Sequence, residues 1–209
     1  MSRPPRILSR TGLYHVIFQG INRQNIFEDE KDYEKFIDIL KDIKIEKSCK
    51  FYAYCLMTNH VHIFIKEETI GDIKKIMHKV LTRYVGWYNF KYQRSGSLVG
   101  NRYKSEPVED EKYYFALIRY IHKNPVKAGI TNDPKQYPWS SYNDYIGKGL
   151  GLTDTEFLLS MLSANHENAI KSFIEFHEEE GNEDFSIAER KRLSDEQAKK
   201  KIKMIYIKQ

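Results

Sequence analysis

Two histidines on alternate positions of one apolar segment are the residues best suited to metal chemistry. His60 and His62 lie in "CLMTNHVHIFIK", residues 55–66, whose alternation is typical of a β-strand. Residues two apart on a strand project to the same face, roughly 6.5–7 Å apart along the backbone. Two imidazoles at that spacing can share one divalent cation. The pair is therefore half of a candidate metal site, and the ordinary alternative is two hydrogen-bonded histidines on a sheet surface.

A nucleophile and a third ligand are offered by the segment "RYIHKNP". Tyr120 and Asn124 are four residues apart, so they are neighbours on one face of a helix. The amide oxygen of Asn124 could join the two imidazoles, and three neutral ligands leave the full charge of the cation for an anionic substrate. His122 is a competing ligand, although it lies about 200° around the helix from Tyr120. Tyr120 in a core and Asn124 as an ordinary helix end are the alternatives without chemistry.

Composition predicts a folded intracellular protein. The 209 residues are 41% hydrophobic and 13% aromatic, which supplies a packed core, and the net charge of +5 permits a polyanionic partner. Cys49 and Cys55 lack zinc-knuckle spacing, so we expect reduced thiols in the cytoplasm. No apolar run approaches the roughly 18 residues of a membrane span. If nucleic acid binds, we expect it along the basic residues between positions 74 and 127.

Hydrophobic periodicity predicts the elements that position these residues. We expect strands at 11–19, 51–57, 60–66 and 102–109, the last at a sheet edge, and helices at 29–47, 70–92 and 110–123. This order fits an α+β, ferredoxin-like sandwich in which helices cover one face of an antiparallel sheet. Val61, Ile63 and Ile65 point into that core, which leaves the histidine face free for a site.

Two features predict boundaries. Asn124–Pro125 is expected to stop the third helix, because a residue before proline is pushed out of helical geometry. The glycines of "GKGLG" predict a boundary near residue 148. The principal, catalytic domain would then be 1–148, followed by a small helical region, 149–209, with helices at 154–162, 167–180 and 195–206. The last of these is either a tail or the start of a truncated helix-turn-helix module.

Several motifs together resemble a known family. These are "YHVIFQGINRQNIF", the His-Val-His of residues 60–62, "NRYKS", "RYIHKNPVKAGI" and "YPWSSY", and they span about two-thirds of the chain. The combination resembles the Y1 tyrosine transposases of the HUH nuclease superfamily, which are IS200-like, and is most similar to the REP-associated tyrosine transposases.

The resemblance implies a ferredoxin-like fold, a divalent metal (Mg²⁺ or Mn²⁺) and strand transfer on single-stranded DNA near hairpins through a 5′-phosphotyrosine. His60 and His62 match the metal ligands, Tyr120 the nucleophile and Asn124 the third ligand. Tyr113 and Tyr114 are rival nucleophiles on the same helix. One departure is Gln19, where the family often has arginine, and Asn22 and Arg23 are expected to compensate.

The resemblance also implies DNA as the partner, in single-stranded or hairpin form. Arg102, Lys104, Lys123 and Lys127 are the basic residues expected to steer its backbone. A monomer is favoured over a homodimer, and the protein is expected in the cytoplasm, at the nucleoid when it is bound to DNA.

Three other functions compete with strand transfer. In a hydrolytic metal-dependent nuclease, water attacks and Tyr120 only positions DNA. A domesticated hairpin-DNA binding protein would keep the fold without cutting. In a purely structural protein, the histidines would only pack.

Overall fold

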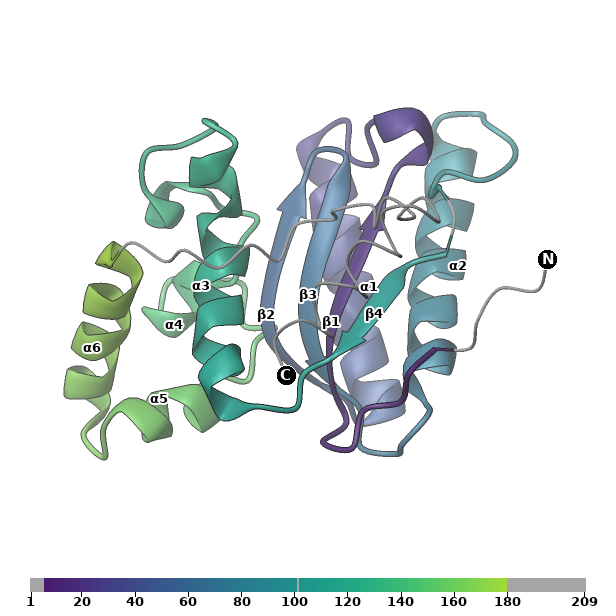
Figure 1. The fold of residues 1–209 in the computed structure, drawn as a ribbon. Helices are drawn as coiled ribbons and strands as arrows, with labels where there is room; N and C mark the ends of the chain where they lie inside the picture. The colour runs from purple at the N-terminus through teal and green to yellow at the C-terminus, as the bar shows by residue number, and fades with distance from the viewer. Residues whose placement is uncertain (1–5, 101, 180–209) are drawn as a thin grey trace, which may run out of the picture.

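The sheet contains four antiparallel strands in the order β2-β3-β1-β4. They are β1 (Leu13–Gln19), β2 (Lys50–Met57), β3 (His60–Lys66) and β4 (Lys104–Pro107). This is a computed structural model, and it describes residues 6–100 and 102–179 (Figure 1). With helices between β1 and β2 and between β3 and β4, the topology is ferredoxin-like and confirms the expected α+β fold.

Two amphipathic helices cover one face of the sheet. They are α1 (Glu30–Lys47), which Asp29 begins with a capping box, and α2 (Ile73–Lys91). Their apolar stripes meet the inward residues of the two central strands in one core, which includes Tyr14, Val16, Phe18, Val61, Ile63 and Ile65. Alternation along each strand sends every second side chain into this core. The histidines of β3 therefore face the opposite side of the sheet, as expected.

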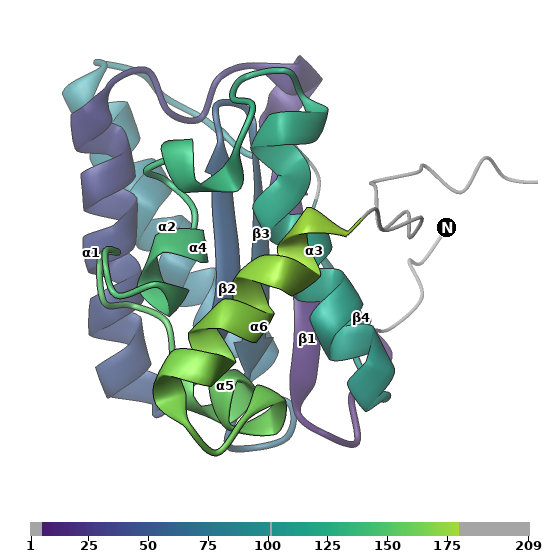
Figure 2. The ribbon, with the colours of Figure 1, turned by 90° about the vertical axis from the view of Figure 1, so that its left-hand side faces the viewer.

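That opposite side is not free, and here the expectation from the sequence was wrong. Helix α3 (Glu111–Lys127) lies on it, and α4 (Tyr142–Tyr145), α5 (Glu156–Leu162) and α6 (His166–Glu178) pack beside α3 near β2 (Figure 2). The cause is that these strands are apolar on both faces. A second core therefore forms from residues such as Ala53, Met57, Phe64, Leu117, Ile121 and Phe173. The candidate site lies at the border of this core.

Helix α3 also continues through the proline that was expected to stop it. Pro125 lies inside α3, which ends only at Lys127. Proline lacks the N–H that would bond to the carbonyl of Ile121. The side chain of Asn124 replaces that donor, since its Nδ2 lies 2.8 Å from the carbonyl oxygen of Tyr120 and 3.4 Å from that of Ile121. A side-chain amide thus compensates for the missing backbone bond.

Three short elements were not predicted: the 3-10 helices η1 (Ile21–Arg23) and η2 (Pro134–Gln136), and α4. The expected helix at 195–206 lies outside the described residues, and the division of the chain near residue 148 stays a prediction.

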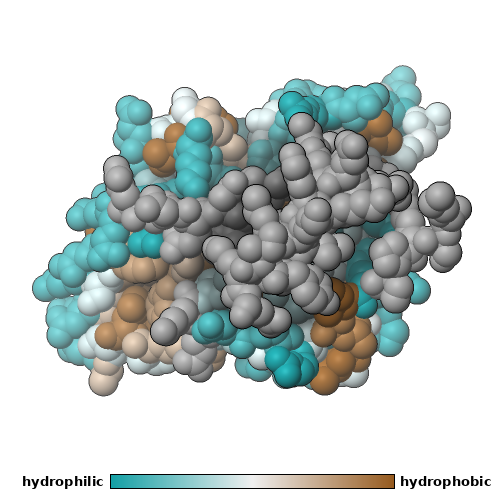
Figure 3. All heavy atoms as spheres, in the orientation of Figure 1, coloured by the Kyte–Doolittle hydropathy of each residue, from teal (hydrophilic) through white to brown (hydrophobic). Residues whose placement is uncertain are grey.

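On the face shown in Figure 3, the upper edge of the described surface is mainly hydrophilic. No helix among the described residues is long and apolar enough to cross a membrane.

A buried chain of hydrogen bonds joins α6 to α3 and to the sheet. His177 Nδ1 donates to the carbonyl of Phe173, so its Nε2 accepts from His122 Nδ1 at 3.0 Å. His122 Nε2 then accepts from the Ser141 hydroxyl at 2.7 Å, and that hydroxyl accepts from the N–H of Tyr54. Both ring nitrogens of His122 are therefore engaged, by His177 and by Ser141, and not by the histidines of β3, which excludes His122 as a metal ligand in this arrangement.

This chain of bonds predicts acid sensitivity. Burial lowers the pKa of His177 to about 4, against about 6.5 for an unfolded histidine. The unfolded state therefore binds an extra proton between these pH values, and stability falls as the pH drops through this window. For His177 alone, we expect the free energy of unfolding to decrease by about 2 kcal/mol from pH 7.5 to pH 5. Urea unfolding at both pH values measures the change.

The control for this prediction is His177→Gln, which keeps an acceptor for His122 but does not titrate. Between pH 7.5 and pH 5, the free energy of unfolding of this variant should decrease by about 2 kcal/mol less than that of the parent. An equal pH dependence in the two proteins would show that His177 does not carry the effect.

Candidate active site

The site is built at the end of the molecule where β3 begins. Figures 1 and 2 both place η1, the β2–β3 turn and the C-terminal ends of α2 and α3 at this end. His60 and His62 are the first and third residues of β3, and their ring centroids are 5.2 Å apart. The alternation expected from the sequence thus brings both imidazoles to one face.

The ring of His60 is oriented by the β2–β3 turn. Its Nδ1 lies 2.7 Å from Oδ1 of Asn59, whose Nδ2 in turn donates to the carbonyl of Arg23 in η1. An amide oxygen can only accept, so His60 carries its proton on Nδ1. The Nε2 lone pair is therefore the one that His60 can offer to a ligand.

A third histidine, which was not among the residues predicted for the site, contacts His62. His15 on β1 places its Nε2 3.1 Å from Nδ1 of His62, and the two rings stack with centroids 5.3 Å apart. The signal in the sequence was weak, because the contact depends on the antiparallel register of β1 and β3. In this register Ile17 is opposite His62, which makes His15 a diagonal neighbour on the same face.

Burial keeps these imidazoles neutral. The side chain of His62 is only 1% exposed, and burial, followed by its histidine neighbours, holds its pKa well below the usual range. Burial also lowers the pKa of His60, and that of His15 to about 3. Neutral imidazole is the form that binds metals, so the site is ready to ligate at neutral pH without first losing protons.

Tyr120, the residue predicted from the sequence as a nucleophile, lies against the histidines. Its ring meets His62 edge to face at a centroid distance of 5.5 Å, and meets His15 at 6.2 Å. The rival Tyr114 instead packs against Phe64 at 5.8 Å. Burial raises the pKa of Tyr113, the other rival, and the carboxylate of Glu106 raises it further, which opposes its use as a nucleophile.

The donor set fits a divalent cation. Within residues 6–100 and 102–179, no three side chains of His, Cys, Asp or Glu are grouped to hold a metal. A third ligand from this part of the chain must therefore be of another type. Asn124 uses its Nδ2 on helix carbonyls, so its Oδ1 remains the atom that can ligate. Two neutral imidazoles and one amide oxygen are acceptable ligands for Mn²⁺ or Mg²⁺.

Asn22 and Arg23 are exposed on η1 in an uncommon backbone conformation. Their φ angles are 51° and 62°, in the left-handed region. Asparagine tolerates this region, whereas arginine at such a φ costs roughly 1–2 kcal/mol. Gly20 permits the turn, since a Cβ there would lie 2.1 Å from the carbonyl oxygen of Gln24. Strain of this kind concentrates at binding sites.

The other basic residues predicted for DNA divide into three groups. Lys127 is exposed, with its Nζ 4.7 Å from the ring centroid of Tyr120. Lys123 donates to the carbonyl of Glu179 at the end of α6. Lys104 is exposed on β4, where it pairs with Ile17 of β1, and Arg102 is exposed just before that strand. Lys127 thus contacts the ring of Tyr120.

Most of the basic residues along α2 have acidic partners. Lys75 pairs with Asp72, both Lys79 and Arg83 pair with Glu46, and Lys91 pairs with Asp29 and Asp32. These ion pairs join α2 to the adjoining segments. Of the basic residues between positions 74 and 127, Lys127 lies at the same end of the molecule as η1, which makes that end a candidate nucleic-acid interface.

Two solved structures resemble this one. The structure of a REP-associated tyrosine transposase bound to a REP hairpin matches with a TM-score of 0.61 and 17% identity, over 73% of this chain and 88% of the other. A crystal structure of a candidate transposase from Deinococcus radiodurans R1 matches with a TM-score of 0.41 and 19% identity, over 59% of this chain and 95% of the other. The first shows that the fold is shared.

The sequence itself gives the family. No curated protein matches the chain. The family model described as "Transposase IS200 like" matches residues 9–124, more than half of the chain, and these residues include the histidine pair, Tyr120 and Asn124. Membership implies a DNA-cleaving enzyme. The chain therefore belongs to the IS200-like transposases, the Y1 family.

Proposed function

We propose that this chain is a transposase-like endonuclease and strand transferase for single-stranded DNA, with Tyr120 as its nucleophile. The observation that carries the proposal is the position of Tyr120, edge-on to His62 at 5.5 Å and at the same end as His60. A purely structural tyrosine has no need of two neutral imidazoles with ligating nitrogens beside it. We also propose that it is related to the REP-associated tyrosine transposases.

The reaction is a transesterification. The Tyr120 oxygen forms a bond to the phosphorus of the scissile phosphodiester, and the bond from phosphorus to the 3′ oxygen breaks. The hydroxyl proton of Tyr120 leaves during attack, and the departing 3′ oxygen gains a proton to become a 3′-OH. The product is a 5′-phosphotyrosine, which conserves the ester bond so that rejoining needs no ATP. The ammonium group of Lys127, 4.7 Å from the ring, stabilises negative charge that develops on Tyr120.

The proposed cofactor is Mg²⁺ or Mn²⁺, held by Nε2 of His60, Nε2 of His62 and Oδ1 of Asn124. When bound, the cation would withdraw charge from the phosphate oxygens. The chain's own contribution is to hold these three ligand atoms neutral and oriented. Asn59 orients His60, and helix α3 carries Asn124 one turn from Tyr120, so ligand and nucleophile move together.

The proposed substrate is single-stranded DNA beside a hairpin. The similar structure is of a protein bound to a REP hairpin, and this chain exposes Asn22, Arg23 and Lys127 at the same end as the site. Phosphate contacts by such residues position a strand. Arg102 and Lys104 would extend the contact along β4, and Lys123 would contribute near α6. We further propose a monomer that acts in the cytoplasm, at the nucleoid when bound.

The test is to trap the covalent product. The full chain is incubated with a hairpin-bearing single strand and Mn²⁺, using strands labelled at the 3′ or the 5′ end. A 5′-phosphotyrosine retains the 3′ label on the protein and releases a shorter 5′-labelled strand that ends in a 3′-OH. Peptide mapping should place the nucleotide on Tyr120, and chelation should abolish both products.

Other results would identify the competing functions. Cleavage in which neither label stays on the protein would indicate a hydrolytic nuclease. Tight hairpin binding without cleavage, across several hairpins and both metals, would indicate a DNA-binding protein. A nucleotide on Tyr113 or Tyr114 would keep the chemistry but overturn the assigned nucleophile.

A further inference from the structure

His15 has no role in the reaction described above, yet it is among the most constrained side chains of the site. It is fully buried on β1, stacked on His62 and edge-on to Tyr120. Its Nε2 pairs with Nδ1 of His62 at 3.1 Å. Among the described residues, no atom pairs with its Nδ1.

A histidine at this position costs stability. A buried polar atom without a hydrogen bond costs about 1–3 kcal/mol. Leu13 and Ile17 are the neighbours of His15 on the same face of β1, and they are apolar and buried without that cost. Packing alone would therefore favour an apolar residue. The placement indicates that the bond to His62 has a use that offsets its cost.

Only two arrangements of protons satisfy the bond between the two neutral rings. In one, His15 Nε2–H donates to His62 Nδ1, and His62 then carries its own proton on Nε2, where it cannot bind a cation. In the other, His62 Nδ1–H donates to His15, and the Nε2 lone pair of His62 is free. The second also matches His60, which donates from Nδ1 to Asn59.

We propose that His15 is a positioning residue that accepts the Nδ1 proton of His62 and so makes Nε2 of His62 a metal ligand. This inference rests on the proposed function. Metal-bound histidines generally donate their other N–H to a fixed acceptor, which sets tautomer and ring orientation. Here the acceptor is a second imidazole on the adjacent strand, and it also touches the ring of Tyr120, so it aligns ligand and nucleophile from one place.

The first measurement uses the unaltered, metal-free chain. Nitrogen NMR of the histidine rings at neutral pH distinguishes a protonated from a bare nitrogen. We expect His62 to carry its proton on Nδ1. A proton on Nε2 of His62 in this protein would overturn the proposal, whatever the activity of the enzyme.

The second measurement is Mn²⁺ affinity by calorimetry, without DNA. His15→Leu removes the acceptor, and we expect its Kd to rise by about 10- to 100-fold, as for other outer partners of metal ligands. His15→Gln places an amide oxygen near the former Nε2, and we expect it to restore most of the affinity. His78→Leu on α2, an exposed histidine, controls for adventitious Mn²⁺ binding.

The outcomes separate this inference from the proposed function. Equal Mn²⁺ affinity in the parent and His15→Leu would overturn the positioning role and leave the metal site intact. No Mn²⁺ binding by the parent would count against the metal site itself, and the NMR result would then decide the tautomer alone. If His15→Leu does not fold, His15→Gln and the parent spectra still carry the test.

Discussion

Tyr120→Phe is expected to form no covalent adduct with DNA and to cleave at least about 10⁴-fold more slowly, as when the nucleophile of another covalent enzyme is removed. Phenylalanine retains the ring, so the edge-on contacts with His62 and His15 stay in place. The ammonium group of Lys127 also keeps its position over the ring. Only the attacking oxygen is lost. Hairpin-DNA affinity and Mn²⁺ affinity should therefore remain within about threefold of the parent.

The matched control is Tyr113→Phe, which removes a hydroxyl from the same helix, two turns earlier. It should form the adduct at nearly the parental rate. Two results would contradict the prediction in different ways. An adduct that persists in Tyr120→Phe would move the nucleophile to another tyrosine. Cleavage that persists without an adduct would show that water attacks and Tyr120 only positions DNA.

The sequence was most informative where one periodic pattern settles the structure. Alternation around His60 and His62 placed both on one face of β3, and the helical spacing of Tyr120 and Asn124 placed both on α3. It failed for Pro125, because the steric restriction on the residue before proline is a bias and not an absolute stop, and Asn124 stays in α3, which ends at Lys127. The Asn124 amide also offers a donor to the carbonyl of Ile121, which proline leaves without its backbone bond.

Two features of the site were not predicted from the sequence: the helices that cover the histidine face, and the contact between His15 and His62. Whether the histidine face is open depends on what packs there, and β2 carried a sign of the second layer that the prediction did not use. Its residues are apolar on both faces, as in a strand that is covered on both sides. His15 could be placed on the histidine face, but its bond to His62 depends on the β1–β3 register. Contacts between segments 47 residues apart are set by tertiary pairing, which local patterns do not contain.

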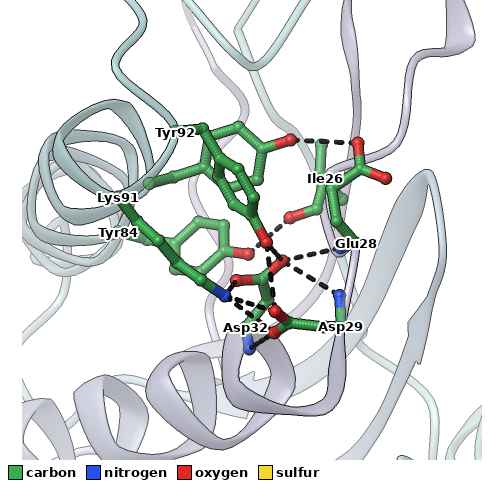
Figure 4. A network of polar contacts seen from close by, with 8 residues as sticks. Ile26, Glu28, Asp29, Asp32, Tyr84, Lys91 and Tyr92 are labelled. Carbon is green, nitrogen blue, oxygen red and sulfur yellow. Dashed lines mark hydrogen bonds and ion pairs between the residues drawn. The ribbon is translucent and has the colours of Figure 1, made fainter.

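A buried network of polar contacts holds the segment that leads from η1 into α1. Asp32 is 0% exposed and lies at its centre (Figure 4). Its carboxylate accepts from the N–H groups of Glu28 and Asp29, from the Tyr92 hydroxyl and from Lys91 Nζ at 2.7 Å. The C-terminal end of α2 is thereby tied to the N-terminal end of α1, directly after the turn that carries Arg23.

Asp32→Ala is expected to lower the free energy of unfolding by about 3 kcal/mol. Two backbone N–H groups lose their acceptor, at about 1–3 kcal/mol for each group left unpaired. The Tyr92 hydroxyl keeps the more distant Oδ2 of Asp29, at 3.5 Å. Lys91 also loses its buried partner, although Asp29 still neutralises it. Urea unfolding at pH 7.5 measures the loss. Asp38→Ala, an exposed carboxylate on the same helix, should change stability by no more than about 0.5 kcal/mol.

The same variant tests whether this network supports the DNA-binding end of the molecule. Without the carboxylate of Asp32, the N–H groups of Glu28 and Asp29 should exchange with solvent faster under native conditions. Amides in the centre of β3 should remain among the most slowly exchanging of the protein. Because η1 directly precedes this segment, a looser anchor should also weaken hairpin binding through Asn22 and Arg23. The prediction would be contradicted by a loss of stability below about 1 kcal/mol together with unchanged exchange at Glu28. Solvent would then replace the carboxylate, and η1 and the segment after it would be held by their backbone bonds to the β2–β3 turn instead.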